Sequence, residues 1–195
     1  MKSLLIFGLL MILFLFQTSC VKEVEKIVNV RDTVIVIQKD TITIEKYIRD
    51  TGTVLVLTRH AETSGLGTNP GLSALGIERA NDLAKLLKPT IFQNIYSSNY
   101  NRTIQTANIA AANYSLIPIL YDPLNQNQWI QDLINQNKNK KLLIVGHSNT
   151  IPELLNILSG TKDYTTIPES EYNNLYIVNL AEIGRFSILH LKYGK

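Results

Sequence analysis

The chain has 195 residues, which is room for one ordinary domain with attachments. Its apolar content of 45% is enough for a hydrophobic core, and its net charge of +3 is small. Because lysine and arginine form no dense cluster, the composition argues against a nucleic-acid-binding surface, and we expect no nucleic-acid partner.

The first residues have the pattern of a targeting segment. Residues 4–16 are almost wholly apolar after a short positive start, which suits a signal-peptide core and is too short to span a bilayer comfortably. Cys20, the only cysteine, follows and resembles the lipidated residue of a bacterial lipoprotein. We predict a signal peptide over residues 1–19 and a lipid anchor on Cys20 in the bacterial cell envelope. A plain secretory signal and an anchor helix with a stray thiol are the alternatives.

Residues 20–52 form a second compositional zone, in which β-branched residues are mixed with charged ones. Residues 34–37 and 41–44 are rich in isoleucine, valine and threonine, and a basic residue followed by Asp-Thr recurs at unequal intervals. The alternating pattern favours extended strand, and an irregular, self-associating helix is the alternative. We predict a tether without chemistry of its own.

From Thr53 to Lys195, strands and helices alternate in a single domain. The apolar runs predict strands at residues 53–57, 91–97, 117–120, 141–145, 175–180 and 186–191. Helical spacing predicts helices after Ser73, over residues 102–112, around Trp129 and from Thr150. Alternation of this kind predicts an α/β fold, a three-layer αβα sandwich with a mostly parallel central sheet.

Two of these helix starts carry specific capping signals. Ser73 is predicted to be an N-cap, and Pro89 is predicted to end the helix that Ser73 begins. Thr150 and Glu153 are spaced as a capping box, and Pro152 falls in the first turn, where its missing N–H costs little. The sequence therefore predicts a helix capped by Thr150.

The candidate site residues follow strands or begin helices. Arg59 and His60 follow the strand at residues 53–57, and His147 follows the strand at 141–145. The carboxyl edge of such a sheet is where α/β folds build ligand sites. Arg102 begins a predicted helix, where free N–H groups favour an anion. These residues suit phosphoryl transfer, with His60 as the nucleophile and guanidinium forks holding phosphate oxygens.

The proton donor is the least defined part of the predicted site. Asp122 follows the short strand at residues 117–120 and could donate the proton of the leaving group if its pKa is raised. The alternative is that Asp122 caps a turn before Pro123, a common position for aspartate. Glu62 is expected to order its loop, and His190 is expected to be structural.

Three motifs in this order resemble the histidine phosphatase superfamily, also called the phosphoglycerate-mutase-like family. The run from Arg59 to Glu62 matches its Arg-His-Gly-Glu signature with alanine at the glycine position, and the run from Ser98 to Ala107 matches its second arginine motif. His147 matches its second histidine. The resemblance extends from residue 54 onward, and the short interval before His147 is similar to the SixA-like phosphohistidine phosphatases.

The resemblance implies that His60 becomes phosphorylated while Arg59, Arg102 and His147 hold the phosphoryl group. It implies neither a metal nor a cofactor. We therefore expect a phosphatase that acts on a small phosphorylated substrate or a phosphoprotein, either a phosphomonoester or a phosphohistidine. A catalytically silent, lipid-anchored module that binds phosphorylated ligands is the alternative from another class. A mutase is a further enzymatic alternative.

Overall fold

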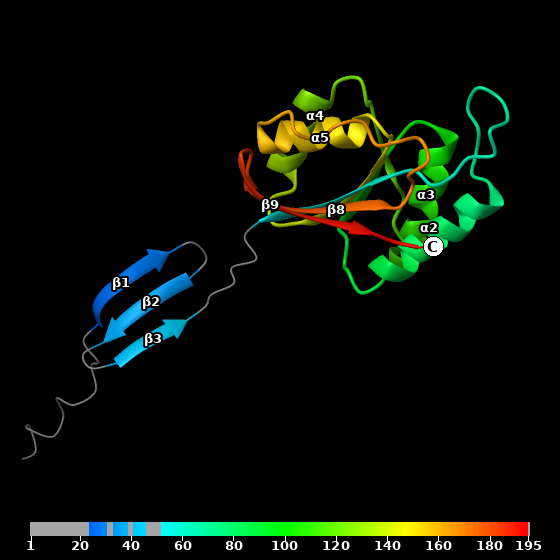
Figure 1. Cartoon of the computed structure of the whole chain (residues 1–195). Coiled ribbons are helices and arrows are strands. Elements are labelled where there is room, and N and C mark those ends of the chain that lie inside the picture. The colour runs from blue at the N-terminus through cyan, green and yellow to red at the C-terminus, as the bar shows by residue number, and fades with distance from the viewer. Residues whose placement is uncertain (1–23, 31–32, 39–40, 46–51, 195) are drawn as a thin grey trace, which may run out of the picture. The chain divides into compact units, whose positions relative to one another are not determined.

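A computed structural model describes residues 24–30, 33–38, 41–45 and 52–194. The chain divides into two compact units, residues 1–49 and residues 50–195 (Figure 1). The predicted signal peptide and Cys20 lie outside the described residues. In the part of the chain that is described, no helix has the length and apolar character needed to cross a membrane.

The first unit contains a small antiparallel sheet. Its strands are β1 (Val24–Val30), β2 (Thr33–Gln38) and β3 (Thr41–Glu45), and they pair in the order β1-β2-β3. The alternation of β-branched and polar residues predicted extended backbone here. It did not predict that the strands pair with one another, because hairpin partners within this zone carry no distinct signal.

The second unit is built on a six-stranded sheet with the strand order β6-β5-β7-β4-β8-β9. The strands β4, β5, β6 and β7 run parallel, whereas β8 and β9 pair antiparallel at one edge. The predicted α/β fold with a mostly parallel sheet is therefore confirmed. The strands are β4 (Thr53–Arg59), β5 (Asn94–Ser98), β6 (Ile119–Tyr121), β7 (Lys141–Gly146), β8 (Asn174–Glu182) and β9 (Arg185–Lys192).

Helices cover both faces of this sheet (Figure 1). They are α2 (Ala74–Leu87), α3 (Asn101–Ala111), α4 (Gln126–Gln136) and α5 (Thr150–Ser159), with a short 3₁₀ helix at Ala112–Tyr114. The pair α2 and α3 lies on one face, and the pair α4 and α5 lies on the other (Figure 1). The arrangement is the three-layer sandwich that the strand-helix alternation predicted.

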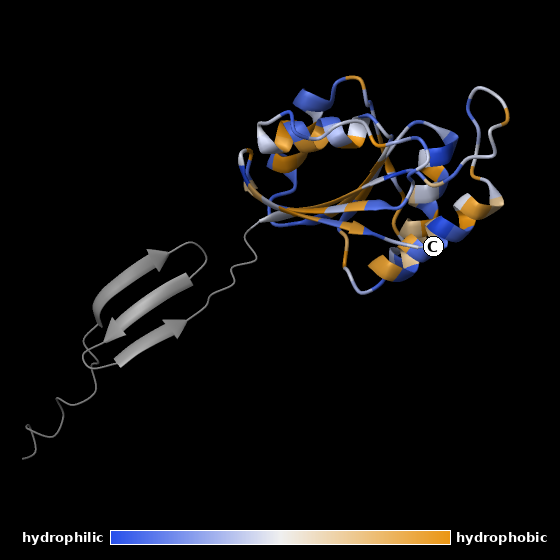
Figure 2. Cartoon of the chain, in the orientation of Figure 1, coloured by the Kyte–Doolittle hydropathy of each residue, from blue (hydrophilic) through white to orange (hydrophobic). Residues whose placement is uncertain are grey.

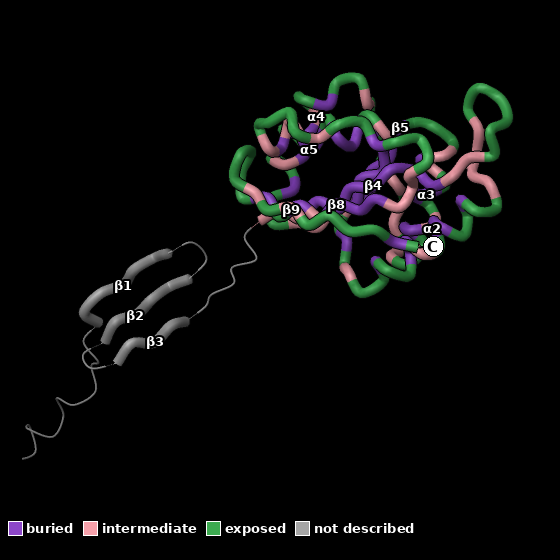
Figure 3. The backbone as a smooth tube through the Cα atoms, viewed as in Figure 1, coloured by how far each residue is buried: buried purple, intermediate pink, exposed green. Residues whose placement is uncertain are grey.

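The unit has two hydrophobic cores, one on each face of the sheet. The central strands β4 and β7 contribute side chains to both, because successive side chains of a strand point to opposite faces. Leu55 and Ile144 join the core under α4 and α5, whereas Val56 and Val145 join the core under α2 and α3. Figure 2 shows apolar residues along the central sheet, and Figure 3 shows β4 as buried. Each fully buried aliphatic side chain contributes about 1.5–3 kcal/mol, so the ends of these two strands are firmly placed.

The start of α2 follows the sequence prediction, and the start of α5 departs from it. Ser73 Oγ accepts the N–H of Gly76 at 3.0 Å, as an N-cap does. Asn149, not Thr150, is the N-cap of α5, and it makes no side-chain capping hydrogen bond. Thr150 Oγ1 instead accepts the backbone N–H of His147 at 2.8 Å. The predicted capping box is wrong because this hydroxyl fixes the turn that carries His147.

Candidate active site

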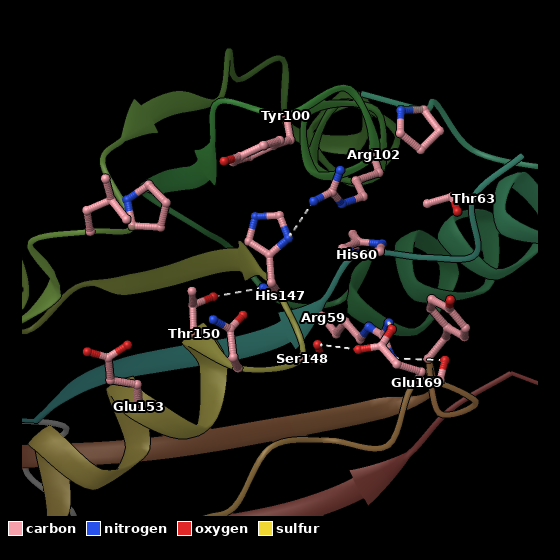
Figure 4. Close-up of a pocket in the computed structure, with 15 residues that line it drawn as sticks. Arg59, His60, Thr63, Tyr100, Arg102, His147, Ser148, Thr150, Glu153 and Glu169 are labelled. Atoms are coloured by element: carbon pink, nitrogen blue, oxygen red, sulfur yellow. Dashed lines mark hydrogen bonds and ion pairs between the residues drawn. The ribbon is translucent and has the colours of Figure 1, made fainter. Parts of the chain in front are cut away.

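A cavity of about 520 Å³ opens at the carboxyl ends of the central strands (Figure 4). Four of the five side chains predicted to take part in catalysis line it: Arg59, His60, Arg102 and His147. The rings of His60 and His147 lie 5.4 Å apart between centroids. Because β4 and β7 are parallel neighbours, their strand ends bring together two histidines that are distant in the sequence.

His60 presents one free ring nitrogen. Its Nδ1 lies 2.8 Å from the carbonyl oxygen of Ala61, and a carbonyl can only accept, so Nδ1 carries the proton. Burial, with smaller effects from the nearby His147 and arginines and against the opposing effect of the Ala61 carbonyl, lowers the pKa of His60 to about 3. The imidazole is therefore neutral at neutral pH, and Nε2 holds an available lone pair.

His147 is held by a chain of hydrogen bonds. Arg102 Nη2 lies 3.4 Å from His147 Nδ1, and a guanidinium only donates, so Nδ1 accepts. Nε2 therefore carries the proton and donates to Ser98 Oγ at 2.8 Å, and that hydroxyl donates to Thr103 Oγ1 at 3.0 Å. Burial, followed by the positive charge of Arg102 and Arg59, lowers the pKa of His147 to about 4. The ring is neutral and fixed in orientation.

Arg102 lies in the first turn of α3, as the sequence predicted. Its guanidinium lies over the ring of Tyr100, 4.6 Å from the ring centre, and that ring packs T-shaped against the His147 ring. The same helix anchors the segment that carries His60, since Thr106 Oγ1 accepts the backbone N–H of Ala61 at 3.1 Å. The helix start thus positions a positive charge and the histidine loop together.

Arg59 is more enclosed than a strand-end arginine would suggest. Its side chain is 2% exposed, and its guanidinium lies 4.1 Å from the ring centre of Tyr172. Its hydrogen bonds go to residues 168–171, and its Nη2 forms an ion pair with the carboxylate of Glu169. The structure brings Arg59 to the cavity but engages it with the loop at residues 168–172, which no sequence pattern connects to the site.

Glu62 orders its loop. Its carboxylate pairs with Arg79 of α2, with 2.7 Å from Oε1 to Arg79 Nε and to Nη2, and both side chains are largely buried. Its backbone carbonyl accepts the N–H of Ser73 at 2.9 Å. Because Glu62 contacts α2 and its N-terminal cap, it holds the segment after β4, which carries His60, against that helix.

The structure does not bring Asp122 to the cavity, which corrects its prediction as the acid. Asp122 is exposed, and its carboxylate accepts the backbone N–H of Leu124 at 2.9 Å and the side-chain amide of Asn125 at 3.3 Å. It caps the turn after β6, which is the alternative that the sequence left open. Its neighbours Pro123 and Leu124 line the cavity instead.

Several other lining residues were not assigned to the site from the sequence, among them Tyr100, Glu153, Glu169 and Tyr172. Tyr100 adjoins the second arginine motif, so its position could have been inferred. Glu169 and Tyr172 lie between α5 and β8 in a stretch with no helical or alternating pattern. No signal in the sequence links that stretch to Arg59, which is about 110 residues earlier.

The family model described as "Histidine phosphatase superfamily (branch 1)" matches residues 55–126. A search of curated proteins finds no match. Among solved structures, the protein histidine phosphatase SixA complexed with tungstate is 17% identical, with 71% of this chain and 96% of that chain covered and a TM-score of 0.59.

Two other solved structures are similar. The Entamoeba histolytica phosphoserine phosphatase mutant with phosphoserine is 19% identical, with 72% and 96% of the two chains covered and a TM-score of 0.58. A mycobacterial glucosyl-3-phosphoglycerate phosphatase is 13% identical, with 72% and 99% covered and a TM-score of 0.61. Over residues 55–126 the sequence is similar to the histidine phosphatase superfamily, and the fold is shared along nearly the whole length of these solved structures.

Proposed function

We propose that the chain is a phosphatase that hydrolyses a phosphorylated substrate through a covalent phosphohistidine on His60. One observation carries the proposal: a neutral imidazole, with its Nδ1 proton held by Ala61 and its Nε2 lone pair available, lines a cavity that also holds two arginines. Phosphoryl transfer needs positioning and positive charge more than covalent help from the protein. The cavity supplies both.

In the first step, Nε2 of His60 attacks phosphorus and the bond from phosphorus to the leaving oxygen breaks. Arg102 faces the transferring oxygens with a fork of donors at the start of α3. The Ala61 carbonyl accepts from Nδ1–H and so stabilises the positive charge that the phosphorylated ring acquires. In the second step, water attacks phosphorus and the P–N bond breaks, which restores neutral His60.

The arginines supply the positive charge that a bound metal supplies in other phosphatases, so we expect turnover in the presence of a chelator. The test uses an aryl phosphate with the purified chain and follows both release of phosphate and a covalent adduct. We expect an acid-labile, base-stable phosphoryl group on the peptide that contains His60. Hydrolysis that leaves no such adduct in rapid-quench samples, or an adduct on another residue, would contradict the proposal.

The leading alternative is a module that binds phosphorylated ligands without turning them over. It is favoured by the ion pair between Arg59 and Glu169, because this pair occupies a donor that a phosphate would use. The two proposals differ in one result. The binding module would bind inorganic phosphate, release none from the aryl phosphate and leave His60 unmodified.

We also propose that Cys20 carries a lipid that attaches the protein to a bacterial envelope membrane. The support is the sequence pattern alone: a short apolar core followed by the only cysteine of the chain. We expect Cys20→Ser to move the protein from the membrane fraction to the soluble fraction of cells, since the attachment site for the lipid is lost. Continued membrane attachment of the variant would count against lipidation.

A further inference from the structure

A single loop holds most of the guanidinium of Arg59. Its Nη1 donates to the carbonyl oxygens of Pro168, Glu169 and Glu171 at 3.0, 3.2 and 3.1 Å. This nitrogen carries only two N–H bonds, so both of its hydrogens are already donated to carbonyl oxygens of the protein. The edge formed by Nε and Nη2 is the one that an oxyanion could take with two parallel hydrogen bonds.

Only one of the two nitrogens on that edge of the Arg59 guanidinium has a hydrogen-bond partner. Nη2 donates to the carboxylate of Glu169, whereas Nε is buried without a hydrogen-bond partner. An unsatisfied buried donor costs about 1–3 kcal/mol. A phosphate that places one oxygen on Nε and another on Nη2 would satisfy both nitrogens of Arg59. Phosphate and the Glu169 carboxylate therefore compete for Nη2.

The Glu169 side chain can rotate away from Arg59 at little cost. It is 77% exposed, so it loses little burial when it rotates. Its other oxygen accepts from Ser148 Oγ at 2.8 Å. Ser148 follows His147, and Arg59 precedes His60, so the carboxylate lies beside both histidine-bearing strand ends (Figure 4). A short rotation keeps it at the cavity that the two histidines share.

We propose that the phosphate of the substrate displaces Glu169 from Arg59, and that the released carboxyl group donates and accepts the protons of the reaction. The inference rests on the proposed phosphatase function and supplies the proton donor that Asp122 does not. It makes Glu169 a catalytic residue that the bound substrate itself sets free.

The charges around Glu169 favour this change of role. In the free protein the Ser148 hydroxyl, and then Arg59, lower the pKa of Glu169, so the group is a carboxylate. A phosphate on Arg59 removes the effect of that cation and adds negative charge, and both changes raise the pKa of Glu169. The other charged or titratable groups that line the cavity are His60, Tyr100, Arg102, His147, Glu153 and Tyr172.

When the substrate displaces it from Arg59, the Glu169 carboxylate takes up one proton from solvent, and the chemistry then balances in two steps. While His60 Nε2 forms its bond to phosphorus, the leaving oxygen takes the proton of the Glu169 carboxyl group and departs as an alcohol. In the second step the Glu169 carboxylate takes a proton from the attacking water, and the electrons of the P–N bond return to Nε2. Inorganic phosphate leaves, the Glu169 carboxyl group gives its proton to solvent, and the resulting carboxylate can pair again with Arg59.

The other carboxylates near the cavity are less well placed. Asp122 is engaged in its turn. Glu153 lines the cavity from α5, where its carboxylate accepts from the buried amide of Gln126 at 2.7 Å. In Figure 4, Glu153 lies on the far side of Thr150 from His60, whereas Glu169 lies on the side of Arg59.

The test compares Glu169→Gln with the wild-type full chain on two substrates, 4-nitrophenyl phosphate and glycerol 2-phosphate. A nitrophenolate leaves without a proton, whereas an alkoxide needs one. We expect Glu169→Gln to lower kcat/KM for glycerol 2-phosphate by about 100-fold or more, and that for 4-nitrophenyl phosphate by less than about 10-fold. We also expect inorganic phosphate to bind more tightly, because its internal competitor is gone.

The matched control is Glu171→Gln, which removes the same charge from the same loop. The Glu171 carboxylate contacts Lys192 and Asn174 and is outside the cavity lining, so we expect little change on either substrate. Equal losses on both substrates with weaker phosphate binding would overturn the inference and make Glu169 a positioning residue. A loss confined to glycerol 2-phosphate in Glu153→Gln instead would also overturn it. If the wild type hydrolyses neither substrate, the proposed function fails as well.

Discussion

Replacement of His60 by alanine is expected to lower kcat/KM for an aryl phosphate by about 10,000-fold or more, since removal of a nucleophile abolishes the covalent route. The aryl substrate matters because its leaving group needs no proton, so the assay reports the nucleophile and not the acid. Binding of inorganic phosphate should largely survive, since Arg102 and Arg59 remain. The measurements are steady-state hydrolysis and a phosphate titration.

The control for this variant is His190→Ala. His190 Nε2 lies 2.8 Å from Asn174 Oδ1 and its ring stacks on Tyr176, away from the residues that line the cavity. Its loss should leave the rate within about threefold of wild type, as for a change outside the site. If His60→Ala turned over the aryl phosphate as fast as wild type, His60 would not be the nucleophile.

Gly76→Ala is expected to destabilise the protein, although alanine is normally the better helix residue. A Cβ on Gly76 would lie 2.0 Å from the carbonyl oxygen of Glu62 and 2.9 Å from its carbonyl carbon. These are backbone atoms, so α2 must move away from the loop after His60. We expect the free energy of unfolding to fall by about 1–3 kcal/mol. Tm should fall by roughly 2–4 °C for each kcal/mol.

The same substitution at Gly71 is the matched control. A Cβ there would meet the end of the Gln105 side chain at 2.8 Å, and that end can rotate away. We expect a change in the free energy of unfolding of less than about 1 kcal/mol. A stability equal to or above wild type for Gly76→Ala, measured by thermal unfolding, would show that the contact with Glu62 is not rigid. Activity should fall together with stability at Gly76, because the displaced loop adjoins His60.

The strand-end histidines could be predicted because their signal is local. Each follows an unbroken apolar run, and such runs are buried strands of a parallel sheet. Arg102 could be placed for a similar reason, since a polar loop and helical spacing follow the strand before it. The strand end or helix start that carries each of these residues already lies at the site, so no distant contact had to be inferred.

Glu169 and Tyr172 could not be found in this way. They belong to an irregular stretch, and their contacts with Arg59 span more than 100 residues of sequence. The prediction that Thr150 caps α5 was wrong for a different reason. Its hydroxyl could cap α5 or accept from the turn before it, and sequence alone does not choose between two nearby hydrogen bonds. The pairing of β1, β2 and β3 likewise depends on partners that alternation does not specify.

The position of β7 has a consequence for folding order during synthesis. β7 lies between β5 and β4, and the backbone N–H of His60 donates to the carbonyl oxygen of Gly146 at 2.9 Å. Until β7 has left the ribosome, the earlier strands lack the neighbour that joins them into one sheet. Non-local pairing of this kind is slow to form and leaves strand edges open meanwhile. The two histidines therefore meet only when β7 enters the sheet, so a nascent chain that ends before residue 141 cannot bring them together.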